Sequence, residues 1–259
     1  MPLVNTEIRG QIAVIELCRP ESGNALSSGL VSELTAAVAG APAGGRRALV
    51  LAGAGRHFCA GADLAELAAT ADAPEGDRFA DAMRLADLYS ALLRSPLVTV
   101  AAVHGAAFGG GAGLAAACDL VVAGQGARFQ FSEARLGFVP ALISVFLPRR
   151  IGSARLGRLF LDPDPLGPDA ARDLGLVDEI GPDPRAAAEL LAAEACRKVS
   201  PSAVSETKRL LLDLAFPDLD RRFTVAARVN ARQRASAECR RGLRLFLETK
   251  RFPDWLDEG

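Results

Sequence analysis

Hydrophobic and polar residues along the first two thirds of the chain alternate in blocks that predict strands followed by helices. Apolar runs typical of strands occupy residues 8–17, 48–52, 97–103 and 120–123. Apolar residues recur at helical spacing over residues 27–39 and 79–93, and Ser27 or Ser28 is a suitable cap for the first of these helices. Repeated strand–helix units imply parallel strands covered by helices, so the pattern predicts an α/β fold.

The pattern changes towards the end of the chain. From about residue 200 the sequence is arginine-rich, has helical spacing throughout and contains no run typical of a strand. We therefore divide the chain into a core at residues 1–199 and a helical region at residues 200–259. Residues 70–77 are small, acidic and proline-containing, which predicts a mobile loop.

Composition narrows the class of protein. The 259 residues carry a net charge of −1, which argues against nucleic-acid and membrane-surface binding. No apolar run reaches the roughly 18 residues of a spanning helix, and the N-terminus lacks a signal-peptide pattern. Five scattered cysteines predict reduced thiols and a cytoplasmic location. The two histidines lie near no cysteine pair, so we expect no metal site.

Two glycine-rich turns carry the candidate chemistry. They read FCAGADL at residues 58–64 and HGAAFGGGAG at residues 104–113, and each follows an apolar run and opens a predicted helix. Neither fits a nucleotide-binding motif. Backbone N–H groups at a helix start face developing negative charge, so one from each turn can form an oxyanion hole on a thioester oxygen. The alternative is that the glycines only make tight strand-to-helix turns.

These turns belong to a set of motifs that resembles the crotonase (enoyl-CoA hydratase/isomerase) superfamily. The other motifs are Asn24-Ala25-Leu26 and Phe131-Ser132-Glu133 with its downstream Leu-Gly and Pro, and the likeness runs in order from about residue 8 to the end. The resemblance implies a spiral of ββα units with a C-terminal helical region used in trimer contacts. It also implies a homotrimer or homohexamer that acts on an acyl-CoA or acyl-carrier-protein thioester, with coenzyme A only as part of the substrate and no separate cofactor.

The resemblance also assigns site residues. The oxyanion donors would be the N–H groups of Ala62 and Gly110, and Glu133 would be the catalytic acid or base. Apolar neighbours at residues 131–139 should raise the pKa of Glu133 towards neutrality. The alternative is that Glu133 only follows a Ser132 cap at a helix start. The residues expected to hold the thioester and its coenzyme A are Ala25, Leu26, Ala62, Asp63, Leu64 and Gly110.

One departure from the family pattern bears on the reaction. Many hydratases have a second glutamate where this chain has Gly113. A single carboxylate suits a double-bond isomerase, which takes a proton from one carbon and returns it at another. The GGGxGL turn and residues 132–152 instead resemble the methylglutaconyl-CoA hydratase branch and related dehydratases that act on an acyl carrier protein. We therefore expect a hydratase or dehydratase, in which one glutamate serves as base and then as acid.

Other residues admit chemistry but favour simpler roles. We expect structural roles for His57 and His104, a helix cap at Asp63, packing at Cys59, and no serine nucleophile. Ala65 replaces a lysine of some relatives, which leaves Arg19, Arg56, Lys250 and Arg251 as candidates for phosphate contacts. The arginines after residue 220 are interspersed with acids, which favours a solvated face or salt bridges over a nucleic-acid surface. A non-catalytic thioester-binding protein is a further alternative.

Overall fold

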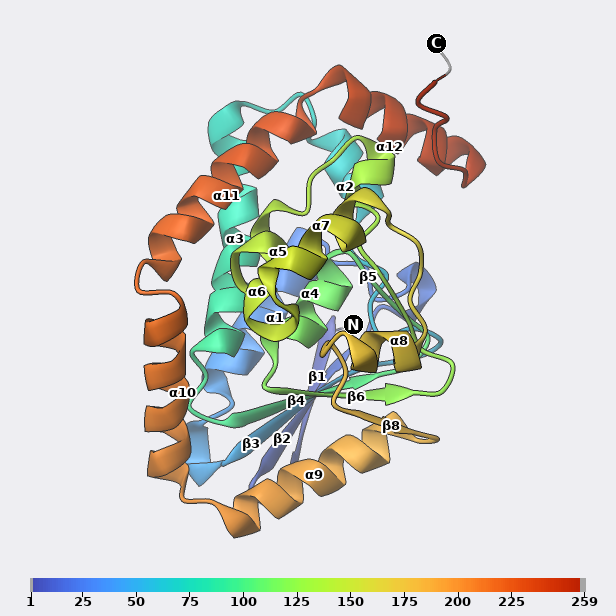
Figure 1. Cartoon of the computed structure of the whole chain (residues 1–259). Coiled ribbons are helices and arrows are strands. Elements are labelled where there is room, and N and C mark those ends of the chain that lie inside the picture. Colours follow the sequence, from blue (N-terminus) through green and yellow to red (C-terminus); the bar gives the residue numbers. More distant parts are fainter. Residues whose placement is uncertain (1, 257–259) are drawn as a thin grey trace.

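A computed structural model describes residues 2–256, and its centre is a six-stranded sheet in the order β1-β2-β3-β4-β6-β8. Strands β2, β3, β4, β6 and β8 are parallel, and β1 is antiparallel to β2 (Figure 1). The strands are β1 (Val4–Arg9), β2 (Ile12–Leu17), β3 (Ala48–Gly53), β4 (Val98–Val103), β6 (Leu120–Gly124) and β8 (Glu179–Gly181). The predicted α/β class is confirmed.

The single strand predicted over residues 8–17 is wrong. The structure divides this stretch into the end of β1 and the whole of β2, joined by a tight turn in which Gly10 has a φ of 61°. The residues on both sides of this turn include apolar ones, so the stretch has the pattern of one continuous strand. Gly10 is the main sequence signal of the turn. Two further strands, β5 (Ala106–Phe108) and β7 (Arg128–Gln130), form a separate parallel pair.

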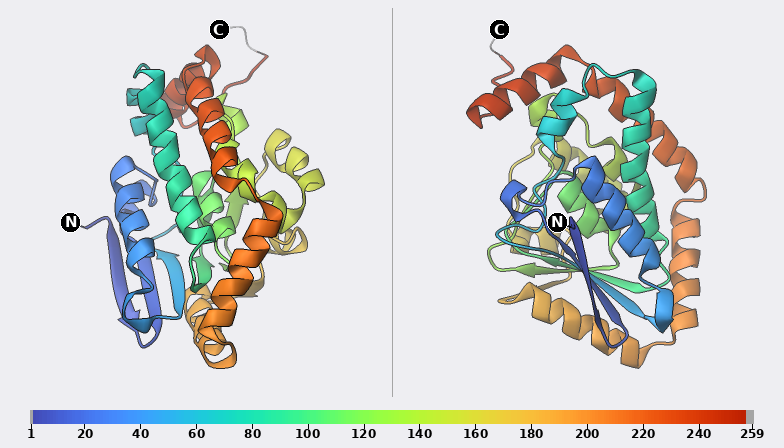
Figure 2. Two further views of the ribbon diagram at one scale, coloured as in Figure 1. Left: turned by 90° about the vertical axis from the view of Figure 1, so that its left-hand side faces the viewer. Right: turned by 180° about the vertical axis from the view of Figure 1, so that it is seen from behind.

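Alternate residues of the strands face two different layers. On one face, Val14, Val50 and Val100 pack against Ala188 and Ala192 of α9 (Pro184–Lys198). The opposite face packs in the main core, which also holds side chains of α1 (Ser28–Gly40) and α3 (Glu75–Leu93). Figure 2 shows α9 along the edge of the molecule, on the side of the sheet away from α1 and α3. Helices therefore cover both faces, as the continuous apolar strands predict.

The remaining helices occur in two groups. Those between the first glycine turn and β8 are α2 (Leu64–Ala69), α4 (Gly110–Ala117), α5 (Ala141–Phe146), α6 (Pro148–Ile151), α7 (Ser153–Leu161) and α8 (Pro168–Asp173). Those after α9 are α10 (Pro201–Ala215), α11 (Leu219–Arg234) and α12 (Ala237–Thr249). The helices predicted over 27–39 and 79–93 are confirmed. The second begins at Glu75, so the loop predicted over residues 70–77 ends earlier than expected.

The last three helices lie along the outside of the core and over one end of it (Figure 1). Lys208 of α10 donates to Leu97 O at 2.6 Å and to the Asp119 carboxylate at 2.5 Å, beside the starts of β4 and β6. Arg78 of α3 donates to Ala231 O of α11 at 2.9 Å. The described part of the chain contains no helix with the length and apolar character needed to cross a bilayer. The division at residue 199 remains a prediction.

Candidate active site

The two glycine-rich turns, far apart in sequence, lie side by side. Cys59 and Ala107 form a parallel bridge, with hydrogen bonds from Cys59 N to Ala106 O and from Phe108 N to Cys59 O, both 3.0 Å. Gly61 has a φ of 100°, and a Cβ there would lie 2.7 Å from Phe108 O and 3.8 Å from Gly110 N. Glycine permits both this backbone conformation and this close approach. The pairing therefore places the first turn against the start of α4.

Both predicted oxyanion donors have free N–H groups. Within residues 2–256, neither Ala62 N nor Gly110 N donates a hydrogen bond to another group of the chain. Gly110 is the first residue of α4, where N–H groups have no partner inside the helix. Ala62 lies beside Leu26, whose N–H is bonded to Gly61 O at 2.8 Å. Two unused donors on adjoining turns are the requirement for an oxyanion hole.

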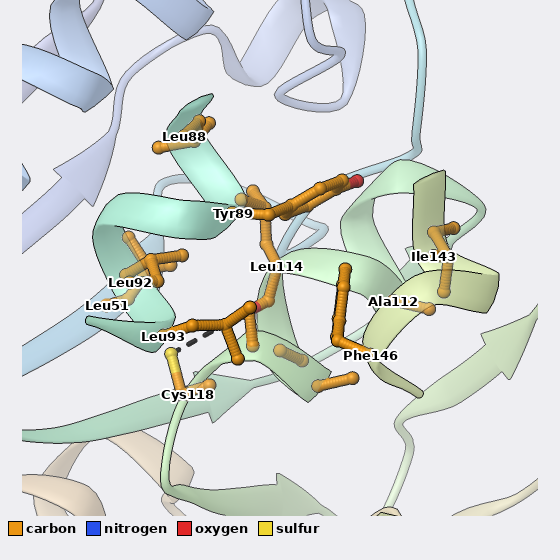
Figure 3. Close-up of a cluster of buried hydrophobic side chains, with 14 of the residues drawn as sticks. Leu51, Leu88, Tyr89, Leu92, Leu93, Ala112, Leu114, Cys118, Ile143 and Phe146 are labelled. Atoms are coloured by element: carbon orange, nitrogen blue, oxygen red, sulfur yellow. Dashed lines mark hydrogen bonds between the residues drawn. The ribbon is translucent and has the colours of Figure 1, made fainter. Parts of the chain in front are cut away.

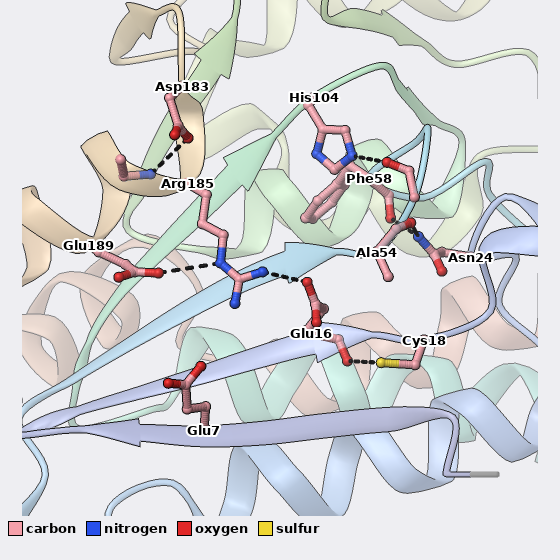
Figure 4. Close-up of polar contacts among 12 residues, drawn as sticks. Glu7, Glu16, Cys18, Asn24, Ala54, Phe58, His104, Asp183, Arg185 and Glu189 are labelled. Carbon is pink, nitrogen blue, oxygen red and sulfur yellow. Dashed lines mark hydrogen bonds and ion pairs between the residues drawn. The ribbon is translucent and has the colours of Figure 1, made fainter.

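Asn24 holds the first turn in place. The residue is fully buried with a left-handed φ of 56°, and its side-chain amide donates to Ala54 O at 2.9 Å (Figure 4). The same amide donates to His57 O at 2.8 Å. The two histidines brace the same loop: His104 Nε2 lies 3.0 Å from Gly55 O, and His57 Nδ1 accepts from Ala106 N at 3.1 Å. These contacts agree with the structural roles predicted for the histidines. The sequence showed Asn24 only as part of a motif, with no sign of this anchoring.

Asp63 caps the helix that follows the first turn. Its Oδ1 accepts from Glu66 N at 3.2 Å at the start of α2, as predicted, and its Oδ2 pairs with the Arg19 guanidinium at 3.1 Å. Arg19 also donates to Ala25 O at 2.6 Å, and its backbone N–H donates to Asn24 Oδ1 at 2.9 Å. Arg19 therefore ties the capped turn to the segment around Asn24. These bonds fix the position of the first turn, which carries the free Ala62 N–H group.

Glu133 lies opposite the second turn, at the start of the short 3₁₀ helix η3 (Glu133–Leu136). A Cβ built on Gly109 would lie 3.1 Å from Glu133 Oε1, so the carboxylate adjoins the residue before the Gly110 N–H. Its other oxygen, Oε2, is buried and has no hydrogen-bond partner within the described residues. Burial raises the pKa of Glu133 to about 7, as the apolar neighbours predict. A carboxyl group with this pKa can both accept and donate a proton near neutral pH.

The alternative role of Glu133 as a residue after a helix cap is not supported. The Ser132 side chain accepts no hydrogen bond from the start of η3, and that helix has only four residues. A dipole contribution from so short a 3₁₀ segment is small, whereas the burial of Oε2 is a cost that a structural glutamate would avoid. The environment of Glu133 is therefore typical of a reactive carboxyl group.

The position of the absent second glutamate is filled by another side chain. A Cβ on Gly113 would lie 2.7 Å from Tyr89 Oη and 3.0 Å from Ile143 Cγ1, so no side chain fits there without movement. Tyr89 is fully buried, and its hydroxyl donates to Gly110 O at 3.0 Å. Figure 3 shows Tyr89, Ile143 and Phe146 around α4. Among the described residues, the cavity wall therefore has one carboxylate without a partner, that of Glu133, and no sequence motif indicated that Tyr89 takes the second position.

A cavity of about 490 Å³ brings these groups together. Ala62, Gly110 and Glu133 line it, as do Ala25, Asp63 and Leu64 from the expected binding residues. Leu26 lines a smaller adjoining chamber instead. Most of the remaining wall is apolar, and α3, α5 and α12 each contribute side chains to it. The cavity has the size and character of a site for a small acyl group with a few polar contacts.

The other candidate residues occupy different environments. Cys59 is fully buried, and burial raises its pKa to about 12, which fits the expected packing role. Lys250 is exposed and lines the cavity, Arg56 is exposed, and Arg19 is engaged with Asp63 and Ala25. Several arginines after residue 220 pair with acids of the same chain, which agrees with the salt-bridge interpretation. Contacts of Lys250, Arg56 and Arg251 with phosphate remain predictions.

The arrangement can polarise a carbonyl and move a proton beside it. Two N–H groups that meet one oxygen would stabilise the negative charge of an enolate, and loss of one such donor typically costs about 2.7–4 kcal/mol in the barrier. A carboxyl group across the cavity can take the proton whose removal creates that charge.

Comparisons with known proteins identify the family of the chain. A family model described as enoyl-CoA hydratase/isomerase matches residues 7–258. A Thermus thermophilus protein, provisionally named an enoyl-CoA hydratase, is 39% identical over 244 residues that cover 93% of this chain and 96% of the relative.

Solved structures share the fold. The crystal structure of an enoyl-CoA hydratase from Mycobacterium avium is 32% identical with a TM-score of 0.84, over 98% of each chain. A Bacillus subtilis structure, provisionally named a polyketide-biosynthesis enoyl-CoA hydratase, is 25% identical with a TM-score of 0.84 and covers 96% of this chain and 98% of that one. The family match spans nearly the whole sequence, and the fold agrees with it. The chain belongs to the enoyl-CoA hydratase/isomerase family, within the crotonase superfamily.

Proposed function

We propose that the protein is a hydratase or dehydratase that acts on an acyl-CoA thioester with Glu133 as its single reactive carboxyl group. The observation that carries the proposal is the position of Glu133, a half-buried side chain beside Gly109 whose Oε2 is buried and has no hydrogen-bond partner within the described residues, next to the free N–H of Gly110. Its pKa of about 7 lets one group act as base and then as acid. The names of the relatives supply the acyl-CoA substrate class.

The proposed reaction needs one proton carrier. In the dehydration direction, the Glu133 carboxylate takes a proton from the α carbon, and the Ala62 and Gly110 N–H groups stabilise the enolate oxygen. The C–O bond at the β carbon then breaks, the α–β double bond forms, and the proton on Glu133 passes to the leaving hydroxide to give water. Hydration is the reverse sequence, in which Glu133 removes a proton from water and delivers it to the α carbon.

For the acyl group we propose the 3-methylglutaconyl and 3-hydroxy-3-methylglutaryl thioesters. The support is the resemblance of the second turn and of residues 132–152 to the branch that interconverts them. The same resemblance extends to related dehydratases that act on an acyl carrier protein, so such a protein is the alternative carrier to coenzyme A.

The single carboxylate also supports a second candidate, an enoyl-CoA double-bond isomerase. Tyr89 and Ile143 exclude a side chain at Gly113, so no second carboxylate can share a water molecule with Glu133 from that position. An isomerase needs no water, because the proton removed from one carbon returns at another. The third candidate, a non-catalytic thioester-binding protein, would leave the perturbed carboxyl group unused.

An isotope experiment separates these candidates. Purified protein is incubated in H₂¹⁸O with crotonyl-CoA, 3-methylglutaconyl-CoA and a 3-enoyl-CoA, and the products are read by mass spectrometry. We expect ¹⁸O in the product, and a roughly 10²–10⁴-fold lower rate in Glu133→Gln. The matched control is Glu206→Gln, which changes an exposed glutamate that pairs with Arg209. A double-bond shift without ¹⁸O would identify an isomerase, and binding without turnover would identify a binding protein.

A further inference from the structure

Asn230 is a polar side chain of the cavity wall with no hydrogen-bond partner within residues 2–256 and no role in the proposed reaction. Several polar side chains there are engaged within the chain, among them Ser22 with Arg19 O, Tyr89 with Gly110 O and Gln130 with Pro163 O. Four make no side-chain hydrogen bond within residues 2–256: Ser132, Glu133, Asn230 and Lys250. Ser132 and Glu133 adjoin the reacting centre, and Lys250 follows α12. Ser132 has no assigned role either, but it directly precedes Glu133, whereas Asn230 lies on α11, a different element from the one that carries the carboxylate.

Asn230 also lines a smaller chamber of about 70 Å³. Ala62 belongs to the walls of both spaces, so the chamber adjoins the proposed thioester oxygen site. Its apolar wall includes Leu67, Leu85 and Leu142, whereas Lys250 and the residues of α12 line only the larger cavity. We therefore assign the smaller chamber to the acyl chain of the substrate. The part of the larger cavity near Lys250 would then face coenzyme A or the acyl carrier protein.

The charged groups near Asn230 favour an electron-rich partner. Arg234 lies one helical turn further along α11, on the same face, and also lines the chamber, and its Nε is buried with no hydrogen-bond partner in the described chain. The acids of the wall are already paired. Asp81 pairs with Arg234 at 2.5 Å and with Arg84 at 2.8 Å, both within the wall. Glu66 accepts from the N–H and hydroxyl of the first residue of α1, and Asp63 is engaged as described above. The wall of the smaller chamber around Asn230 therefore has hydrogen-bond donors without partners, the Asn230 amide and Arg234 Nε, and no acid without a partner.

We propose that Asn230 is a specificity-determining residue whose amide donates a hydrogen bond to an oxygen on the acyl chain of the substrate. The acyl group would then carry a carboxylate, carbonyl or hydroxyl oxygen beyond its reacting carbons. A plain alkyl chain in the same place would displace water from the amide and leave it without a partner, which makes such a chain the poorer ligand. The inference rests on the proposed thioester function.

Binding of unreactive saturated thioesters tests the inference apart from catalysis. Isothermal titration calorimetry compares pentanoyl-CoA, 5-hydroxypentanoyl-CoA and glutaryl-CoA, together with the corresponding four-carbon set. We expect at least one oxygen-bearing ligand to bind roughly 3- to 10-fold more tightly than the alkyl ligand of equal length, which is the range of one net hydrogen bond. Comparison of the hydroxyl ligand with the carboxylate ligand shows whether the chamber around Asn230 binds a neutral or an anionic oxygen more tightly.

Two variants make the result specific. Asn230→Leu replaces the amide with an apolar side chain of similar size, and it should abolish the preference while alkyl ligands bind as well or better. Thr224→Val is the matched control, because it removes a hydroxyl on the same helix that is bonded to Asp220 O and lines neither space. Thermal unfolding shows that both variants fold. Equal binding of alkyl and oxygen-bearing ligands, or a preference that survives in Asn230→Leu, would overturn the inference but not the thioester function. Failure of every thioester to bind would overturn both.

Discussion

At the scale of single residues, Glu133 links the chemistry of the site to the stability of the protein. Burial raises the pKa of this carboxyl group from 4.5 to about 7, so the folded state holds the proton more tightly than the unfolded state. The stabilisation is fully present below the unfolded pKa and is lost as the pH rises through about 7. The proposed catalysis by ionised Glu133 would increase over the same pH range in which the stability of the protein falls.

We therefore predict a pH-dependent stability difference between wild type and Glu133→Gln. The free energy of unfolding of the wild type should fall relative to the variant by about 3 kcal/mol between pH 4 and pH 8. Urea unfolding at several pH values measures this difference, in which the other titrating groups largely cancel. A constant difference across this range would show that the carboxyl group is not buried as the structure indicates.

Gly113 gives a second prediction at this scale. Gly113→Ala should lower the free energy of unfolding by about 1–3 kcal/mol, because the new Cβ would press on Tyr89 Oη and Ile143 Cγ1. The matched control is Gly157→Ala in α7, where a Cβ meets nothing within 4 Å and alanine should stabilise the helix. Thermal and urea unfolding of the pair measure the contrast. Equal behaviour of the two variants would contradict the proposed packing of Tyr89.

Sequence reasoning reached Ala62, Gly110 and Glu133 through their motifs, and the structure brings all three to one cavity. Their catalytic roles are still predictions. Tyr89 and Asn230 could not be found in this way, because their places depend on how α3 and α11 pack rather than on any local pattern. A buried tyrosine in an amphipathic helix has the same sequence signature as an ordinary core residue.

At the scale of elements, the cap of α2 connects a helix start to the first turn. Asp63→Ala removes the hydrogen bond to Glu66 N and the ion pair with Arg19, and should cost about 0.5–2 kcal/mol of stability. Since the Ala62 N–H precedes this cap directly, we also expect a lower kcat. Asp183→Ala removes the equivalent cap of α9, on the opposite face of the sheet, and should lower stability without lowering kcat. Steady-state kinetics and urea unfolding of both variants measure the contrast.

Long helices and strands could be predicted from the sequence, whereas short ones could not. Strands β3, β4 and β6 were predicted because each is a continuous apolar run, and α1 and α3 because they span several turns. Strands β5, β7 and β8 have three residues each, too few to show a period, and β5 and β7 pair through contacts between distant segments. The hairpin of β1 and β2 was missed because its short turn falls inside the run that was predicted as one strand.

At the scale of the whole molecule, Lys208 attaches α10 to the core. Its ammonium group meets Leu97 O and the Asp119 carboxylate, and only 11% of its side chain is exposed. Lys208→Met should cost about 1–3 kcal/mol, because Asp119 keeps its bonds from Thr99 but loses its buried cation. Lys198→Met is the control, since the exposed pair of Lys198 with Glu194 should contribute less than about 1 kcal/mol. Urea unfolding of the two variants measures the difference.

The bridge between Cys59 and Ala107 has a consequence for the denaturation of the protein. It joins segments that follow different strands, so the two N–H donors can meet only when β3 and β4 are already paired. A fragment that contains either turn alone cannot assemble the pair. The proposed oxyanion hole therefore forms only when the central sheet is folded. Loss of activity in urea should coincide with the unfolding of this sheet rather than precede it.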